Sequence, residues 1–281
     1  MGLRLTGINR YPIKSCRGHA VPSAVVRPWG LDGDRRWMLV NEAGWAVTAR
    51  EYPQLVLVNP RLTAGGLLVE TPGADPLWVR TPTEGAHLRV WLRGSEVQAT
   101  AAAEQAHAWF STLVHTPVRL VYLDDPTRRR PDPRYSSDHD RVSFADGFPL
   151  LLASEDSLAA LNALIADGPN TAEGPIPMAR FRPNLVVAGA PAWDEDRWRV
   201  LQIGEASFRV AKGCSRCVVT TIDPATATRG KEPLSTLVRH RRWDGRAWFA
   251  VNLIPCSSGA TIRLGDEVKI VKRVETAGPP R

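Results

Sequence analysis

The sequence has few cysteines, no long hydrophobic run and no signal-peptide core, and each shortage excludes a class of protein. Four cysteines, at positions 16, 214, 217 and 256, are too few for a disulfide framework in a chain of 281 residues. The longest apolar run, at residues 149–153, is far shorter than the roughly 20 residues that cross a bilayer. The first ten residues lack the apolar core of a signal peptide. We therefore expect a cytoplasmic protein with free thiols and no membrane association.

Repeats and common nucleotide-binding motifs are also missing. No Gly-X-Y or heptad repeat and no glycine-rich phosphate loop occurs, and 43% hydrophobic residues with ten tryptophans argue against disorder. The formal net charge of +7 suits anionic ligands or nucleic acid. The two dense basic clusters, at residues 127–131 and 239–242, lie in no nucleic-acid-binding motif, so we interpret them as solvated charge and expect no nucleic acid as partner.

Short alternating segments separated by turn residues dominate the chain and are typical of β-strands. Helical periodicity predicts helices at residues 101–115, 155–166 and 232–242, with Ser154 as the N-cap of the second and Pro233 at the start of the third. Residues 124–140 are expected to form a loop. Because βαβ alternation is absent, the pattern predicts a β-rich α+β fold, most similar to a barrel. Strands are expected at residues 3–10, 24–27, 36–41, 45–48, 55–59, 67–70, 77–80, 87–92, 96–100, 118–123, 183–187, 198–203, 207–212, 218–221, 247–253, 261–263 and 267–271.

Cys214 and Cys217 form a Cys-x-x-Cys pair within KGCSRCVVTTIDP at residues 212–224. The pair could be half of a zinc site, but no second pair of Cys or His ligands follows at usable spacing. It could also be a thioredoxin-like redox pair, but the βαβ context of such a pair is absent. A third interpretation is a single thiolate whose pKa is lowered by the neighbouring Lys212 and Arg216. The structural alternative is two thiols at the start of a strand.

The cysteine segment resembles the motif C-S-R-C-[IV]-x-T-T-[IV]-D-P of the MOSC family, the molybdenum-cofactor sulfurase C-terminal domain. The resemblance is to the branch of mitochondrial amidoxime-reducing components. Other tracts resemble the same branch in the same order, and six ordered tracts are far more specific than one. They are YPIKSCRG at residues 11–18, DRRW at 34–37, VTAR at 47–50, RFRPNL at 180–185, RGKEPL at 229–234 and G-x-x-x-x-x-G-D-x-V at 259–268.

The resemblance implies a MOSC β-barrel preceded by an N-terminal β-barrel-like region, with a few helices. The family's own division predicts an N-terminal region at residues 1–120 and a MOSC domain at residues 121–281. Because the candidate cofactor residues come from both ends of the chain, an alternative joins residues 1–52 to 126–281 and leaves 53–125 as a smaller lobe. In that case Lys14 and Arg35 approach Cys217 across a shared cleft.

The resemblance also implies a molybdenum cofactor, a pterin with a dithiolene on the metal and a terminal phosphate. In the family the second cysteine of the motif, here Cys217, is the metal ligand and the catalytic residue, and thiolate sulfur suits molybdenum. Phosphate binds to cations and N–H groups, so Lys14, Ser15, Arg35 and Arg182 are its candidates. Thr48, Arg50 and Asn184 are candidates for the pterin edge or the phosphate. The wider MOSC family is also associated with pyridoxal phosphate.

Members of this branch reduce N-hydroxylated compounds: amidoximes, hydroxamic acids and hydroxylamines. The resemblance implies the same two-electron reduction of a small molecule here. The chain lacks the ferredoxin domain and the membrane segment of some relatives, so we expect a separate electron donor, either a flavoprotein or a cytochrome b5- or ferredoxin-like protein. Two alternatives remain open: a carrier that holds a persulfide on Cys217 for metal–sulfur or cofactor assembly, and a nucleic-acid-binding protein that uses the two basic clusters.

Overall fold

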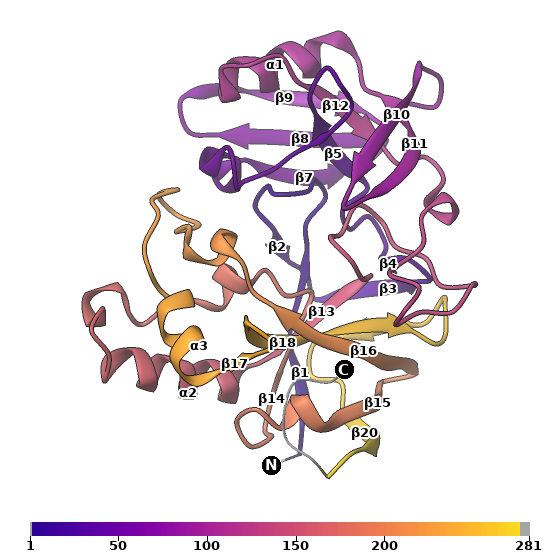
Figure 1. The fold of residues 1–281 in the computed structure, drawn as a ribbon. Coiled ribbons are helices and arrows are strands. Elements are labelled where there is room, and N and C mark those ends of the chain that lie inside the picture. Colours follow the sequence, from indigo (N-terminus) through magenta and orange to yellow (C-terminus); the bar gives the residue numbers. More distant parts are fainter. Residues whose placement is uncertain (1, 276–281) are drawn as a thin grey trace.

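A nine-stranded sheet fills the lower half of Figure 1 and joins the first strand of the chain to the C-terminal half. The computed structural model describes residues 2–275, so the outermost residues of both predicted domains lie outside it. The strand order is β2-β1-β14-β13-β18-β16-β15-β20, with β17 paired to β18, and β13 with β14 is the parallel pair. The strands are β1 (Arg4–Arg10), β2 (His19–Ala20), β13 (Leu150–Ser154), β14 (Leu185–Ala188), β15 (Trp198–Ile203), β16 (Ala206–Ser215), β17 (Arg242–Trp243), β18 (Arg246–Pro255) and β20 (Val268–Arg273).

Three smaller sheets, with strand orders β10-β11-β12-β5-β6, β7-β8-β9 and β19-β3-β4, complete the β-structure. The first two lie with helix α1 in the upper half of Figure 1. Their strands are β3 (Ser23–Arg27), β4 (Gly30–Leu31), β5 (Trp37–Val40), β6 (Ala46–Val47), β7 (Asn59–Thr63), β8 (Gly66–Thr71), β9 (Ala74–Arg80), β10 (His87–Leu92), β11 (Ser95–Ala101), β12 (Arg119–Tyr122) and β19 (Thr261–Arg263). The helices are α1 (Glu104–Val114), α2 (Glu155–Ala166) and α3 (Leu234–His240), with 3-10 turns η1 (Pro53–Leu57), η2 (Pro126–Arg128), η3 (Thr171–Glu173), η4 (Met178–Phe181), η5 (Asp194–Arg197) and η6 (Val218–Thr221).

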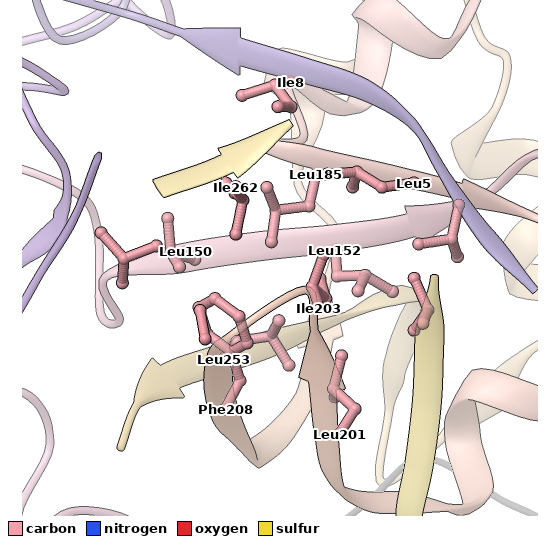
Figure 2. Close-up of a cluster of buried hydrophobic side chains, with 14 of the residues drawn as sticks. Leu5, Ile8, Leu150, Leu152, Leu185, Leu201, Ile203, Phe208, Leu253 and Ile262 are labelled. Carbon is pink, nitrogen blue, oxygen red and sulfur yellow. The ribbon is translucent and has the colours of Figure 1, made fainter. Parts of the chain in front are cut away.

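The core of the large sheet is a cluster of aliphatic and aromatic side chains from strands that are far apart in sequence. Figure 2 shows Leu152, Leu185 and Leu253 pointing toward one another from three neighbouring strands. Ile262 of the small sheet β19-β3-β4 joins the same cluster. The buried faces of the two sheets pack against each other, so the two sheets share one core, as in the predicted barrel.

The β-rich fold class predicted from the sequence is confirmed. The helix at residues 155–166 is confirmed with its cap, because the Ser154 hydroxyl accepts the main-chain N–H of Ser157 at 3.4 Å. The other two helices begin two or three residues later than predicted. Residues 124–140 form an irregular segment with one 3-10 turn, as expected for a loop.

Two predicted strands are wrong, and strands β2, β4, β7, β13 and β17 were not predicted. Residues 55–59 lie mainly in η1, which begins at a proline. Residues 218–221 form η6, because the hydroxyls of Thr220 and Thr221 donate back to the carbonyls of Cys217 and Val218 and hold a tight turn. Strand β13 is buried on both faces, so its sequence shows no alternation to reveal it.

The two basic clusters do not form a continuous exposed surface. Arg129 and Arg241 are buried, and Arg241 pairs with the carboxylate of Asp196 at 2.5 Å. Arg128 and Arg130 pair with carboxylates of their own segment. These arginines are therefore largely used within the fold. Among the helices of residues 2–275, none has the length and apolar character that a membrane span requires.

Candidate functional site

One cavity, the main cavity, collects all eight residues that the sequence analysis singles out. They reach it from loops after β1, β4, β6 and η4 and from the end of β16, so segments at both ends of the chain converge there. Lys14 and Arg35 therefore share a cavity with Cys217, as the cleft prediction requires. The predicted residues that line it are Lys14, Ser15, Arg35, Thr48, Arg50, Arg182, Asn184 and Cys217.

The lining of the main cavity is strongly positive. Its charged side chains include a single carboxylate, that of Asp146. The cavity encloses about 160 Å³ and is open to solvent at its mouth. Six cations around one carboxylate favour an anionic ligand. The cations are Lys14, Arg35, Arg50, Arg93, Arg182 and Arg216.

The main chain around the cavity adopts an uncommon conformation at several non-glycine residues. Ser15, Arg35 and Arg182 have φ values of 70°, 47° and 57°, in the left-handed region that side chains with a Cβ seldom occupy. Arg93, at φ 54°, also lines the cavity. Such conformations persist where the surrounding structure holds them and they cluster at functional sites. They turn successive side chains into the cavity.

Two of these arginines are held on one aromatic ring. The guanidinium carbons of Arg35 and Arg182 lie 4.4 Å and 4.5 Å from the ring centre of Tyr11. The Tyr11 hydroxyl donates to the Pro183 carbonyl at 3.1 Å, which fixes the ring. A Cβ at Gly18 would lie 2.3 Å from a carbon of that ring, so the glycine at the end of YPIKSCRG leaves room for it. The first and last residues of that motif therefore serve one purpose, the placement of two guanidinium groups.

Asn184 and Thr48 face the cavity but use their polar atoms within the protein. The side-chain oxygen of Asn184 accepts from Arg35 at 2.9 Å and from the Leu151 N–H at 3.3 Å, while its amide donates to the Asn9 carbonyl. The Thr48 hydroxyl donates to Glu51 at 2.6 Å. In contrast, the Ser15 hydroxyl has no hydrogen-bond partner within residues 2–275. Asn184 and Thr48 thus position other groups, and Ser15 is free to bind a ligand.

The cationic neighbour of Cys217 is not one of the residues beside it in the sequence. An N–H of Arg50 lies 3.6 Å from the Cys217 sulfur. Arg216 instead lies 2.8 Å from the sulfur of Cys214, and Lys212 lies over the rings of Tyr135 and Trp248. Of the two cations that the sequence places beside the Cys-x-x-Cys pair, Arg216 therefore contacts Cys214 and Lys212 contacts neither sulfur within the described residues. Arg50 supplies the positive charge.

Asp146 and Arg129 are residues of the site to which sequence reasoning gave no role. Asp146 pairs with the ammonium of Lys14 and with Arg93 at 3.0 Å, and its side chain is 51% exposed, toward the cavity that it lines. Burial disfavours its charge, but Lys14 and Arg93 prevail and hold the pKa of Asp146 well below its usual range. Burial lowers the pKa of Lys14 from 10.5 to about 8, against the attraction of Asp146. No spacing in the sequence links Lys14 to Asp146, which lie 132 positions apart.

The cavity offers two cysteines, Cys214 and Cys217, rather than a full set of protein ligands for a metal ion. In the described part of the chain, no three His, Cys, Asp or Glu side chains gather where they could hold a metal ion. A zinc site built on Cys214 and Cys217, one of the open interpretations, therefore lacks its remaining ligands. A metal held at Cys217 would need further ligands from a cofactor.

Comparisons with known proteins agree with this arrangement. Family models described as the MOSC N-terminal beta barrel domain and the MOSC domain match residues 2–117 and 139–269. Mitochondrial amidoxime-reducing component 1 of Homo sapiens is 32% identical over 93% of this chain and 81% of its own length. The chain belongs to the MOSC-domain family. Mitochondrial amidoxime reducing component 2 of Rattus norvegicus is 35% identical over 83% of this MOSC-domain protein and 71% of its own length.

A further relative carries a different name. Molybdenum cofactor sulfurase of Oryza sativa subsp. japonica is 32% identical over 89% of this chain, which spans 32% of that protein. The name of this relative refers to the molybdenum cofactor. The association with pyridoxal phosphate gains no support from these relatives.

Proposed function

We propose that this MOSC-domain protein binds the molybdenum cofactor and reduces N-hydroxylated compounds such as amidoximes, hydroxylamines and hydroxamic acids. The observation that carries the proposal is the main cavity, where Cys217 and six cations face the same space. The relatives named as amidoxime-reducing components support the reaction class. Their identity of about one third supports the class of reaction rather than a particular substrate.

The residues of the cavity fit this cofactor. Its dithiolene brings sulfur ligands with the metal, so the protein needs to add one soft donor, and the thiol of Cys217 is that donor. Its phosphate needs cations and free donors, which Lys14, Arg35, Arg182 and the unpartnered Ser15 hydroxyl supply. When bound, the molybdenum supplies the two-electron redox chemistry.

The chain's own residues then have distinct tasks. Cys217 would serve as the metal ligand, and Arg50 lies against its sulfur. Arg35 and Arg182, whose guanidinium groups lie over the ring of Tyr11, hold the phosphate. Asn184 orients Arg35, and Thr48 holds the turn that presents Arg50. Lys14 and Asp146 form an ion pair in the wall of the main cavity.

We further propose that electrons come from a separate protein. Residues 2–275 hold no cysteine cluster of the kind that binds an iron–sulfur centre. A flavoprotein or a cytochrome b5- or ferredoxin-like protein would meet this need.

The cytoplasmic location stays a prediction, consistent with four unpaired cysteines.

The decisive experiment measures metal and substrate turnover on one preparation. Protein from a host that makes active molybdoenzymes is assayed for molybdenum by mass spectrometry and for pterin by fluorescence after oxidation. The same sample is then given benzamidoxime with reduced methyl viologen as an electron donor. We expect near-stoichiometric metal and pterin, and conversion to benzamidine. Stoichiometric cofactor without reduction of any N-hydroxylated compound would refute the reaction, and absence of both metal and pterin would refute the cofactor.

A persulfide carrier is the second candidate, favoured by the relative named molybdenum cofactor sulfurase. A carrier needs the Cys217 thiol but has no use for a phosphate site built on Lys14, Arg35 and Arg182. Mass spectrometry of the intact chain distinguishes the two, because a persulfide adds one sulfur to Cys217 and needs no pterin. The cation-lined cavity favours the reductase.

A further inference from the structure

A second cavity, the annex, adjoins the main cavity beside the end of β16. The two share seven lining residues, among them Asp146, Phe148, Cys214 and Asn252, so they lie side by side. The annex adds Pro131, Pro133 and Lys212, which the main cavity lacks. A substrate longer than the main cavity would therefore reach the annex past Phe148 and Cys214.

Lys212 is the exceptional cation of the annex. Its side chain is half-buried, and no carboxylate of residues 2–275 forms an ion pair with it. Its ammonium lies 4.4 Å from the ring centre of Tyr135 and 5.6 Å from that of Trp248. The aromatic faces hold the ammonium in place but leave its three N–H donors without an acceptor in the described chain. An oxyanion arriving in the annex would supply that acceptor.

The other cations of the annex already have partners. Arg93 pairs with Asp146, and Arg130 pairs with Asp138. The guanidinium of Arg129 donates to main-chain carbonyls. The second carboxylate of the lining, Asp132, is held by Arg134 at 2.7 Å and 3.0 Å. The charge of Lys212 contributes to lowering the pKa of Asp132, but Lys212 forms no ion pair with it. Among the cations that line the annex, Lys212 is the one whose side-chain N–H donors have no hydrogen-bond acceptor within residues 2–275.

We propose that the annex is a substrate subsite that favours N-hydroxylated compounds carrying a carboxylate or another oxyanion, with Lys212 as the residue that determines this preference. The inference rests on the proposed reductase function and narrows its substrate class. Phe148, Pro131 and Pro133 provide an apolar wall for an aromatic or aliphatic spacer between the reacting group and the anion. The charge of Lys212 would then bind a distal anion without taking part in the reduction.

The test compares two substrates that differ in charge at one end. Cofactor-loaded protein is given 4-carboxybenzamidoxime or its methyl ester, with reduced methyl viologen as the electron donor. We expect kcat/KM for the acid to exceed that for the ester about 3- to 10-fold, mainly through KM, as for one charge-assisted contact. Lys212→Met should abolish this preference and leave the ester unchanged. Raising the salt concentration should reduce the wild-type preference.

A matched variant and a binding measurement complete the design. Lys272→Met removes an exposed lysine of β20 and should keep the preference, which separates a local effect from net charge. Calorimetry with the acid and the ester on the oxidised protein, where no turnover occurs, should show the same loss in Lys212→Met. An equal preference in wild type and Lys212→Met, or no preference at all, would overturn the subsite. If neither compound is reduced but the acid still binds more tightly through Lys212, the reductase proposal fails and the anion subsite stands.

Discussion

The guanidinium of Arg129 donates to the main-chain carbonyl of Asp146 at 3.0 Å, so a buried arginine holds the loop that carries the cavity's carboxylate. It also donates to the carbonyls of Ser143 and Ala145. Lys14 donates to the Phe144 carbonyl at 3.1 Å in the same loop. Arg129 lies in a basic cluster that looks like surface charge in the sequence, yet only 3% of it is exposed. It is a positioning residue for both Asp146 and Lys14.

Replacing Arg129 by methionine should destabilise the protein and reduce cofactor retention together. Three carbonyls lose a charged donor, and unsatisfied buried carbonyls cost free energy, so we expect a loss of about 3–4 kcal/mol in the free energy of unfolding. The loop with Asp146 also binds Lys14 through the Phe144 carbonyl, so the loss of Arg129 should disturb the position of Lys14 in the cavity. We therefore expect less molybdenum per chain than in wild type. Urea denaturation and metal analysis measure the two effects.

Arg130→Met is the matched control for that variant. Arg130 is the next residue, is exposed and pairs with the exposed Asp138, so its loss should change the free energy of unfolding by less than about 1 kcal/mol. Arg129→Lys should recover part of the stability, since one ammonium can serve some of the three carbonyls. Wild-type stability and metal content in Arg129→Met would contradict the positioning role.

Cys217→Ser should remove molybdenum-dependent turnover and leave the fold intact. The thiol lies on the cavity wall and its sulfur contacts Arg50, so a hydroxyl fits the space but lacks the soft donor that molybdenum prefers. Amidoxime reduction should fall at least 100-fold while the melting temperature stays within a few degrees of wild type. Cys256→Ser, at an exposed thiol outside the cavity, should behave as wild type in both measurements. Equal turnover in Cys217→Ser and wild type would show that another group is the ligand.

The sequence identifies eight residues that line the main cavity, because they lie in or beside the short motifs that resemble the MOSC family. The link between Tyr11 and Gly18 illustrates this, since the ring occupies the space where a side chain at Gly18 would lie. Helix α2 was equally predictable, because its cap and its periodicity are both local. Local signals of this kind survive in a single sequence.

Contacts between distant segments were not predictable in this way. Arg50 contacts Cys217 although 167 positions separate them in the sequence, and Lys14 contacts Asp146 although 132 positions separate them. No pattern in either segment predicts these pairings. The buried position of Arg129 was also hidden, because an arginine in a polar segment is usually solvated. Similarly, the β-branched residues of η6 indicate a strand until the hydroxyl bonds of Thr220 and Thr221 are known.

Anion binding in the main cavity should weaken as the pH rises through about 8. Burial lowers the pKa of Lys14 to about 8, so the ammonium is charged below this pH and neutral above it. The carboxyl of Asp146 stays ionised throughout, because its pKa is well below its usual range. Above pH 8 the pair therefore changes from neutral to negative and opposes an anion. We expect the affinity of cofactor-free protein for sulfate, whose charge is constant here, to fall about 10-fold between pH 7 and pH 9.

Two variants test whether Lys14 causes that pH dependence. Lys14→Met should bind sulfate weakly at both pH values, and Lys14→Arg should bind it at both, because arginine keeps its charge. Calorimetry or displacement of a fluorescent anion gives the affinities. A fall of the same size in Lys14→Arg would assign the titration to another group.

Glu195 is a buried acid outside the cavity, and its environment predicts a pH-dependent stability. It lies in η5 with 1% of its surface exposed, and one carboxyl oxygen accepts from the Ser157 hydroxyl at 2.7 Å. The other oxygen is buried and has no partner within the described chain. Burial raises the pKa of Glu195 from 4.5 to about 7, with a further contribution from the nearby charge of Asp196.

Glu195→Gln should therefore stabilise the protein at alkaline pH and have little effect near pH 5. Between pH 4.5 and about 7 the folded chain keeps a proton that the unfolded chain has lost, so wild-type stability falls as the pH rises through this window. Glutamine has no charge to bury, so the variant should gain up to about 3 kcal/mol over wild type at pH 8. Urea denaturation at pH 5 and pH 8 measures the difference, with Glu205→Gln at an exposed turn as the matched control. A gain of the same size at both pH values would mean that packing of the amide, rather than the charge of Glu195, changes the stability.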